Sequence, residues 1–293
     1  MTALQKSLPL VTDIVKFFAP AKLNLFLHVI GRRPDGYHLL QSVFTLVDYG
    51  DHLEIDVRDD GHIRRRNMIA GVPAESDLAI RAAVALKAAA GSQLGADISL
   101  KKRTPMGAGL GGGSSDAASA LIALNQLWKL GLPDAQLKEI GLSLGADVPF
   151  FIQGRSAFVE GIGELLTPVV VPRWWYVVVT PKVHVPTPFV FTHPDLTRTT
   201  PPVKIADFSA TGLANYRNDL QPVVLKAFPA VASGLALLSA ASKKSLFGAR
   251  MTGSGASLFA AFESESDARE AFQKLSPKIT GFVARGLEKH PHL

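Results

Sequence analysis

The sequence predicts an α+β protein built from two domains. A chain of 293 residues is long enough for two cores of ordinary size. Segments with the alternating pattern of strands and segments with helical spacing follow one another along both halves. Segment 168–172 begins and ends with proline, and it is the predicted boundary between domains of residues 1–170 and 171–293. In the second domain we expect helices on one face of a sheet, a ferredoxin-like arrangement.

The first strand pattern covers residues 21–30, with alternate side chains on opposite faces. Leu23, Leu25, Leu27 and Val29 are predicted on one face, and Lys22, Asn24, Phe26 and His28 on the other. The turn residues Arg-Pro-Asp-Gly at 33–36 and a second apolar run at 39–47 predict a hairpin. A separate strand is predicted over residues 53–57. Residues 1–18 lack the features of a signal peptide, so we expect a short extension there.

Helices and strands are then expected in alternation. The expected elements of the first domain are a helix over 77–90, a strand over 98–101, helices over 114–130 and 134–144, and a strand over 157–159. Those of the second domain are a strand over 174–180, a proline-rich loop, a helix over 220–238, two strands around Gly253, a helix over 266–275 and a final strand. The helix over 114–130 has the clearest pattern, because Gly131 and Pro133 follow it as stop residues.

The composition excludes several classes of protein. Apolar residues make up 47% of the chain and charged residues 19%, which is too apolar for intrinsic disorder. No apolar run reaches the roughly 18 residues of a membrane span, so we expect a soluble protein without a membrane partner. The absence of cysteine excludes disulfides and zinc–thiolate sites, and favours the cytoplasm. The net charge of +6 favours anionic ligands, although most basic clusters, such as residues 64–66, are simply solvated.

A glycine-rich segment, residues 105–115, leads directly into the helix expected over 114–130. Five of the seven residues at 107–113 are glycine, so backbone N–H groups can turn toward an anion. The helix start adds further free N–H groups and partial positive charge, and this combination predicts a polyphosphate ligand. Ser114 and Ser115 are candidates for capping the helix, for binding phosphate oxygens or for helping to hold magnesium. A flexible loop with a serine cap is the simpler alternative.

Two other phosphate-binding motifs are candidates for this segment. Gly107, Gly109 and Gly112 satisfy the G-x-G-x-x-G pattern of dinucleotide-binding proteins. The preceding strand is polar and no acidic strand end follows, so an oxidoreductase is the second choice. A P-loop is excluded because no Gly-Lys-Ser/Thr closes the segment. A basic module that binds nucleic acid is a third class, but we expect no nucleic-acid partner.

Four segments together resemble a known family, the GHMP kinases. They are Pro-Met-Gly-Ala-Gly-Leu-Gly-Gly-Gly-Ser-Ser-Asp-Ala-Ala from Pro105, residues 20–40, Leu-Gly-Ala-Asp-Val-Pro-Phe-Phe at 144–151 and Met-Thr-Gly-Ser-Gly-Ala at 251–256. The last three are similar to the branch of the family that acts on a cytidylylated methylerythritol. The resemblance spans nearly the whole chain in the same order.

The resemblance implies a two-domain fold whose N-terminal domain contains a left-handed βαβ unit, with the active site in the cleft between the domains. It implies transfer of the γ-phosphoryl group of ATP to the 2-hydroxyl of 4-diphosphocytidyl-2-C-methyl-D-erythritol, in the non-mevalonate route to isoprenoid precursors. Another small-molecule GHMP kinase is the alternative within the family. Magnesium is expected to arrive with ATP, without a metal site of the protein's own, because the sequence has no His, Cys or carboxylate cluster with ligand spacing. The expected partners are these small molecules, and the expected assembly is a monomer or weak homodimer.

The resemblance also assigns roles to individual residues. Asp147 matches the catalytic base and Lys22 the second catalytic residue, although Asp147 would otherwise be interpreted as a helix cap. The substrate residues are Asn24, Tyr37, His38, Phe191, Gly253 and Ser254, with Phe189 as an alternative to Phe191. The ATP residues are Lys102, Pro105, Met106, Gly107, Ala108, Gly109, Leu110, Gly111, Gly112, Gly113, Ser114 and Ser115. Asp77 stands where relatives often carry an asparagine that contacts adenine, and without the resemblance Tyr37 and His38 would be interpreted as ordinary hairpin residues.

Overall fold

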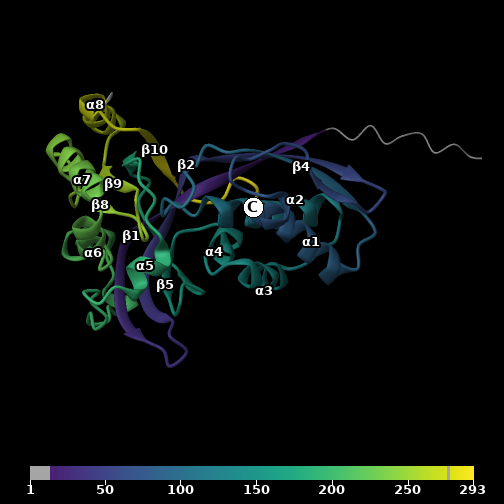
Figure 1. Cartoon of the computed structure of the whole chain (residues 1–293), viewed down its shortest axis with the longest axis horizontal. Coiled ribbons are helices and arrows are strands. Elements are labelled where there is room, and N and C mark those ends of the chain that lie inside the picture. The colour runs from purple at the N-terminus through teal and green to yellow at the C-terminus, as the bar shows by residue number, and fades with distance from the viewer. Residues whose placement is uncertain (1–13, 276–277) are drawn as a thin grey trace, which may run out of the picture.

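The computed structural model describes residues 14–275 and 278–293, and these residues form a mixed sheet covered by helices (Figure 1). The strands are β1 (Val15–Arg32), β2 (His38–Arg58), β3 (Ile63–Arg65), β4 (Gly95–Lys101), β5 (Ala157–Glu160), β6 (Leu165–Pro168), β7 (Trp175–Val179), β8 (Arg250–Met251), β9 (Leu258–Phe262) and β10 (Gly281–Leu287). The helices are α1 (Leu78–Ala90), α2 (Gly112–Leu127), α3 (Asp134–Leu144), α4 (Val148–Gln153), α5 (Thr187–Thr192), α6 (Gln221–Ala227), α7 (Pro229–Ala241) and α8 (Glu265–Leu275). The main path of the sheet runs β3-β4-β2-β10-β7-β9-β8, and β1 pairs with β2.

A long antiparallel hairpin of β1 and β2 forms the centre of the molecule. Its turn is at residues 33–36, as predicted, and there Arg33 N donates to Tyr37 O (2.7 Å) and Gly36 has a φ of 91°. The prediction of two strands over 39–47 and 53–57 was wrong, because β2 continues through Gly50 as one strand of 21 residues. Residues 1–13 lie outside the described residues, and β1 already begins at Val15 rather than after an extension to residue 18.

The alternation predicted for residues 21–30 holds only in its first half. A β-bulge falls between Asn24 and Phe26, where the residue opposite changes from Phe44 to Val43. An extra residue in one strand reverses which face the following side chains occupy. Phe26 therefore joins Leu23 in one core, and Leu27 moves to the face that carries Lys22 and Asn24. The predicted faces of residues 26–29 were wrong for this reason.

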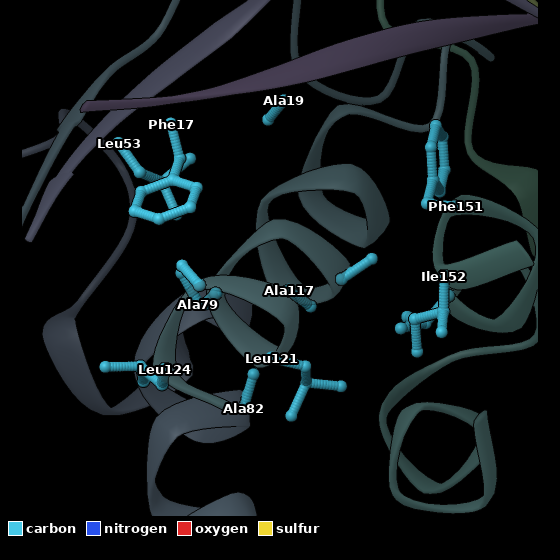
Figure 2. Packing of buried hydrophobic residues seen from close by; sticks show 14 of the residues in the cluster. Phe17, Ala19, Leu53, Ala79, Ala82, Ala117, Leu121, Leu124, Phe151 and Ile152 are labelled. Atoms are coloured by element: carbon cyan, nitrogen blue, oxygen red, sulfur yellow. The ribbon is translucent and has the colours of Figure 1, made fainter. Parts of the chain in front are cut away.

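The N-terminal half packs α1, α2 and α4 against one face of β1, β2 and β4, and Figure 2 shows part of this core. Side chains such as Phe17 and Leu53 from the sheet meet Ala79, Leu121 and Phe151 from the helices. Strands β3 and β4 are parallel, and α1 connects them as a βαβ unit. Helix α1 begins and ends as its sequence indicates, since Asp77 accepts a hydrogen bond from Ala79 N (2.9 Å) and Gly91 follows with a φ of 62°.

The C-terminal half is an antiparallel sheet of β10, β7, β9 and β8 with α6, α7 and α8 packed against it. The single helix predicted over 220–238 was wrong, because Phe228 leaves the helical conformation and Pro229 starts a second helix. The two helices, α6 and α7, meet at 116°. Four short elements, β3, α4, β6 and α5, were not among the predicted helices and strands. Within the described parts of the chain no single helix has the length and apolar character to cross a membrane, and the bent α6–α7 pair passes that test only when its helices are taken together.

The two halves are joined by more than the connecting segment. Strand β10 pairs with β7 and, at its end, with β2. The last residues then return to the N-terminal half, where His290 N donates to Gly154 O (2.8 Å) and Gln126 donates to His292 O (3.2 Å). Figure 1 shows this end of the chain next to α2. The division at residue 170 stays a prediction.

Candidate active site

A cavity of about 670 Å³ opens between the β1–β2 hairpin, α5 and the loop between β8 and β9. Its volume is that of a typical small-molecule site. It is lined by every residue that the sequence assigned to catalysis or to the second substrate, namely Lys22, Asn24, Tyr37, His38, Asp147, Phe191, Gly253 and Ser254. These residues come from five separate segments of the chain, which therefore meet around one space.

The two predicted catalytic residues face each other in this cavity. Lys22 Nζ lies 3.4 Å from Asp147 Oδ2. Lys22 is 4% exposed and its ammonium also lies over the Phe44 ring, 4.2 Å from the ring centre. Asp147 is half-buried at the start of α4, but its side chain makes no capping hydrogen bond. The alternative interpretation of Asp147 as a helix cap is therefore not supported, and its carboxylate stays available to a ligand.

Asn24 and Thr252 tie the catalytic strand to the β8–β9 loop. Asn24 Oδ1 accepts a hydrogen bond from Lys22 Nζ (2.6 Å), and Asn24 N donates to Thr252 Oγ1 (2.9 Å). The amide of Asn24 also donates to Ser42 Oγ (3.2 Å). Thr252 and Ser42 were missed by sequence reasoning, although Thr252 lies inside the quoted Met-Thr-Gly-Ser-Gly-Ala segment. Because Lys22 is held by Asn24 and Asp147 together, its ammonium has a fixed position in the cavity.

The far end of the cavity is aromatic. The ring of His38 lies 5.2 Å from the ring of Phe191, and Tyr37 beside them is 60% exposed. Phe189 points elsewhere, toward Phe228, with 5.6 Å between ring centres, and it does not line the cavity. Of the two phenylalanines considered, Phe191 therefore lies where an aromatic base can stack.

The loop between β8 and β9 closes the remaining side. Gly253 has a φ of 55°, and its carbonyl accepts a hydrogen bond from the Asn218 amide (2.8 Å). Ser254 Oγ lies 2.7 Å from Thr187 Oγ1, so the loop is linked to α5. Asn218 is a third residue that the sequence did not single out.

A second cavity, of about 370 Å³, lies on the other side of the glycine-rich segment. The predicted ATP residues that line it are Lys102, Pro105, Met106, Gly107, Ala108, Gly109, Gly111, Gly112, Gly113 and Ser114. Leu110 and Ser115 are buried and do not line it. Gly107, Gly109 and Gly111 line both cavities. The backbone of these glycines borders both spaces, so ligands in the two cavities would meet there.

Helix α2 begins at Gly112 and points its start into the second cavity. Its cap residue is Gly111, with a φ of 70°, and no side chain caps the helix. Capping by Ser114 or Ser115, one of the roles considered for these residues, is therefore not observed. Ser115 is fully buried and donates to Pro20 O (2.7 Å), which turns its hydroxyl away from a phosphate or metal. The uncapped first turn leaves N–H groups for an anion, and Ser114 is the serine beside them.

A buried ionic cluster lies at the closed end of the second cavity. Lys102 Nζ donates to Asp51 and, at 2.5 Å, to Asp116 Oδ2. Burial acts to lower the pKa of Lys102, but the two carboxylates outweigh it and raise that pKa. Burial raises the pKa of Asp116 to about 8. Asp51 also accepts hydrogen bonds from Arg103 N (2.5 Å) and Thr104 N (2.7 Å), whereas Oδ1 of Asp116 has no hydrogen-bond partner in the described part of the chain.

This cluster predicts a pH-dependent stability. Between about pH 4, the ordinary value for an aspartate, and pH 8, the folded state keeps a proton on Asp116 that the unfolded chain has released. The free energy of unfolding should therefore decrease as the pH rises through this window. In Asp116→Asn the decrease that is due to this carboxyl group should be absent. Urea unfolding of both proteins at several pH values measures the difference. Asp134→Asn, an exposed change at the start of α3, is the control, and equal pH slopes in wild type and Asp116→Asn would contradict the assignment.

Asp77, at the position where the resemblance leads us to expect a contact with adenine, does not present a free side chain. It caps α1 and forms a buried ion pair with Arg65, 3.0 Å between Asp77 Oδ2 and the guanidinium. Strand β4, which leads into the glycine-rich segment, is parallel to the short strand β3 but antiparallel to its other neighbour β2, whereas a dinucleotide-binding domain has a mostly parallel sheet. Among the described residues no three His, Cys, Asp or Glu side chains are placed to hold a metal ion.

The chain matches two family models and many individual proteins. The model "GHMP kinases N terminal domain" matches residues 77–155, and "GHMP kinases C terminal" matches residues 205–278. A 4-diphosphocytidyl-2-C-methyl-D-erythritol kinase of Thiobacillus denitrificans is 54% identical over 94% of this chain and 96% of its own length. The protein of the same name from Burkholderia pseudomallei is 52% identical over 97% and 98%.

Solved structures agree with these relatives. A crystal structure of 4-(cytidine 5'-diphospho)-2C-methyl-D-erythritol kinase superposes with a TM-score of 0.81 and 35% identity, covering 93% of this chain and 99% of the other. A homoserine kinase from Cytophaga hutchinsonii shares the fold, with a TM-score of 0.70 at 18% identity, covering 98% of each chain.

Proposed function

This chain belongs to the GHMP kinases, and from that premise we propose that it transfers the γ-phosphoryl group of ATP to the 2-hydroxyl of 4-diphosphocytidyl-2-C-methyl-D-erythritol. The observation that carries the proposal is the meeting of two cavities at the three shared glycines, beside Lys22 and Asp147. One cavity has an uncapped helix start suited to phosphates, and the other ends in aromatic rings suited to a base. The names of the close relatives supply the identity of the substrates.

Asp147 is the proposed base and Lys22 its partner. The Asp147 carboxylate would accept the proton of the attacking 2-hydroxyl, and the resulting alkoxide would attack the γ-phosphorus of ATP while ADP leaves. The Lys22 ammonium, 3.4 Å from Asp147, is placed to favour the negative charge that develops on that oxygen. Asn24 keeps Lys22 in place, because its Oδ1 accepts a hydrogen bond from the ammonium.

The glycine-rich segment and the start of α2 are the proposed ATP site. Backbone N–H groups at the uncapped first turn would bind the phosphates, and Ser114 would add a hydroxyl. Lys102 lies in the same cavity, within its cluster with Asp51 and Asp116. Magnesium carried by ATP would neutralise charge on the transferred phosphate, with Ser114, not Ser115, as the serine available to it.

The aromatic end is the proposed cytidine site. Tyr37 and Phe191 would stack on the cytosine ring and His38 would hydrogen-bond its edge, while Gly253 and Ser254 would lie near the diphosphate. On this proposal the enzyme works in the non-mevalonate supply of isoprenoid precursors. A cytoplasmic location and a monomer or weak homodimer complete the proposal.

An assay of ADP release decides the proposal. The purified protein should release ADP when it is given ATP, Mg²⁺ and the cytidylylated methylerythritol, and little with homoserine or mevalonate. Activity with either of those alcohols and none with the cytidyl compound would overturn the choice of substrate while leaving the family unchanged.

Tyr37→Ala tests the cytidine site. Loss of stacking worth about 1 kcal/mol should raise KM for the cytidyl substrate about fivefold, with a much smaller change in kcat and KM for ATP. Steady-state kinetics with each substrate varied in turn measure this. Phe189→Ala removes a partly exposed aromatic ring outside the cavity and is the matched control. An equal loss of ATP and cytidyl affinity in Tyr37→Ala would show that the hairpin ring is only structural.

A further inference from the structure

Arg198 holds the aromatic end of the first cavity, although it contributes nothing to the cavity lining. Its Nε lies 3.0 Å from His38 Nε2. One terminal nitrogen of its guanidinium donates to Phe191 O (3.0 Å) and His193 O (2.9 Å), and the other to Leu196 O (3.0 Å). One side chain thus fixes both the ring of His38 and the backbone that carries Phe191.

The contact with Arg198 determines which nitrogen of His38 bears the proton. A guanidinium has only N–H donors and does not lose its proton in proteins, so His38 Nε2 must accept and carry the lone pair. Burial lowers the pKa of His38, and the charges of Arg198 and Arg32 lower it further, so the ring is neutral at pH 7. The remaining proton of a neutral imidazole is then on Nδ1.

The Nδ1–H group is left for a ligand. Within residues 14–275 and 278–293 the ring of His38 makes one hydrogen bond, the one to Arg198. His38 lines the cavity, and its ring lies against that of Phe191. A planar base in contact with Phe191 would therefore meet a hydrogen-bond donor at its edge.

We propose that Arg198 is a positioning residue that selects cytosine over uracil, by holding His38 in the form that donates from Nδ1. Position N3 of cytosine is an acceptor, whereas N3 of uracil carries a hydrogen and is a donor. A fixed Nδ1–H can donate a hydrogen bond to N3 of cytosine. With uracil the same group would face the N3–H group, so two donors would oppose each other. This inference rests on the proposed function, because it takes the pyrimidine of that substrate as the ligand.

The first test is independent of catalysis. The imidazole ¹⁵N resonances of the wild-type protein, with those of His38 assigned by their loss in His38→Gln, should show Nδ1 protonated and Nε2 unprotonated near neutral pH. In Arg198→Met the same ring should become a mixture of the two tautomers. A wild-type ring with the proton on Nε2 would overturn the inference, whether or not the protein has the proposed activity.

The second test compares the cytidyl substrate with its uridyl counterpart in the ADP-release assay. For Arg198→Met the ratio of the two kcat/KM values should fall about 10-fold or more, because a free imidazole can also accept from uracil N3–H. The loss should appear in KM for the cytidyl substrate, with KM for ATP unchanged. Arg198→Lys, which keeps a cationic donor, should retain more of the ratio.

Arg269→Met is the matched control, since it removes an arginine from an exposed ion pair on α8 and this residue lines neither cavity. Its ratio should stay at the wild-type value. An unchanged ratio in Arg198→Met would overturn the inference, as would equal losses for both pyrimidines together with weaker ATP binding. If the wild-type protein acts on neither pyrimidine substrate, the proposed function is wrong. The ¹⁵N resonances of His38 then still test which of its nitrogens is protonated.

Discussion

Asp147→Asn is expected to lower kcat about 100-fold or more while changing KM for both substrates little. The amide keeps the shape of the carboxylate but cannot accept the proton of the attacking hydroxyl. Its partner Lys22 lies 3.4 Å away and would remain in place, because Asn24 also holds it. Steady-state rates of ADP release, with each substrate varied, separate the two effects.

Asp134→Asn makes the same chemical change at the start of the neighbouring helix, outside both cavities, and should keep wild-type rates. Equal thermal unfolding of the two variants would show that the loss in Asp147→Asn is chemical. Full activity in Asp147→Asn would refute its role as base.

Gly109→Ala is expected to abolish most activity with both substrates and to destabilise the protein. Gly109 has a φ of 77°, and an added Cβ would lie 2.2 Å from the carbonyl oxygen of Thr252. The left-handed conformation costs about 1–2 kcal/mol for alanine, and overpacking adds about 1–3 kcal/mol. This clash can be relieved only if the glycine-rich segment and the β8–β9 loop move apart. A displacement of about 1 Å at an active site can lower the reaction rate about 100-fold.

Kinetics and thermal unfolding together test this result. Gly31→Ala is the matched control on β1, because its Cβ would meet only Leu39 at an ordinary 3.5 Å and the residue lines neither cavity. Wild-type stability and rates in Gly109→Ala would mean that the two segments are not in close contact.

Much of the fold was predictable because local residues determine it. Asp77 and Gly91 mark the ends of α1 by capping it, and Gly36 permits the hairpin turn. The wrong predictions concern elements whose bounds depend on contacts between residues that are distant in the sequence. The residues near Gly50 predict a break between two strands, but their pairing with β1 keeps β2 a single continuous strand. At Phe228 the chain turns between α6 and α7, although the apolar residues of these two helices alone predict a single helix.

The candidate site was predictable where residues are close in sequence. Lys22 and Asn24 share a face because they precede the bulge, and the glycine-rich segment reads directly as a phosphate loop. Arg198 gave no sequence pattern, since its partner His38 is 160 residues away. Ser115 appeared available in sequence, but its contact with Pro20, from a distant strand, buries it. Such contacts depend on tertiary packing that no local pattern contains.

The single strand β1 limits how the enzyme can move. It supplies Phe17 to the core of the N-terminal half, Leu23 to the central core and Val29 to the core of the C-terminal half. A rigid rotation of one half against the other would have to bend this strand and break all three packings at once. Closure around a bound substrate is therefore expected in segments outside the cores, chiefly the exposed hairpin tip at residues 33–37, and the halves should melt together in one cooperative transition.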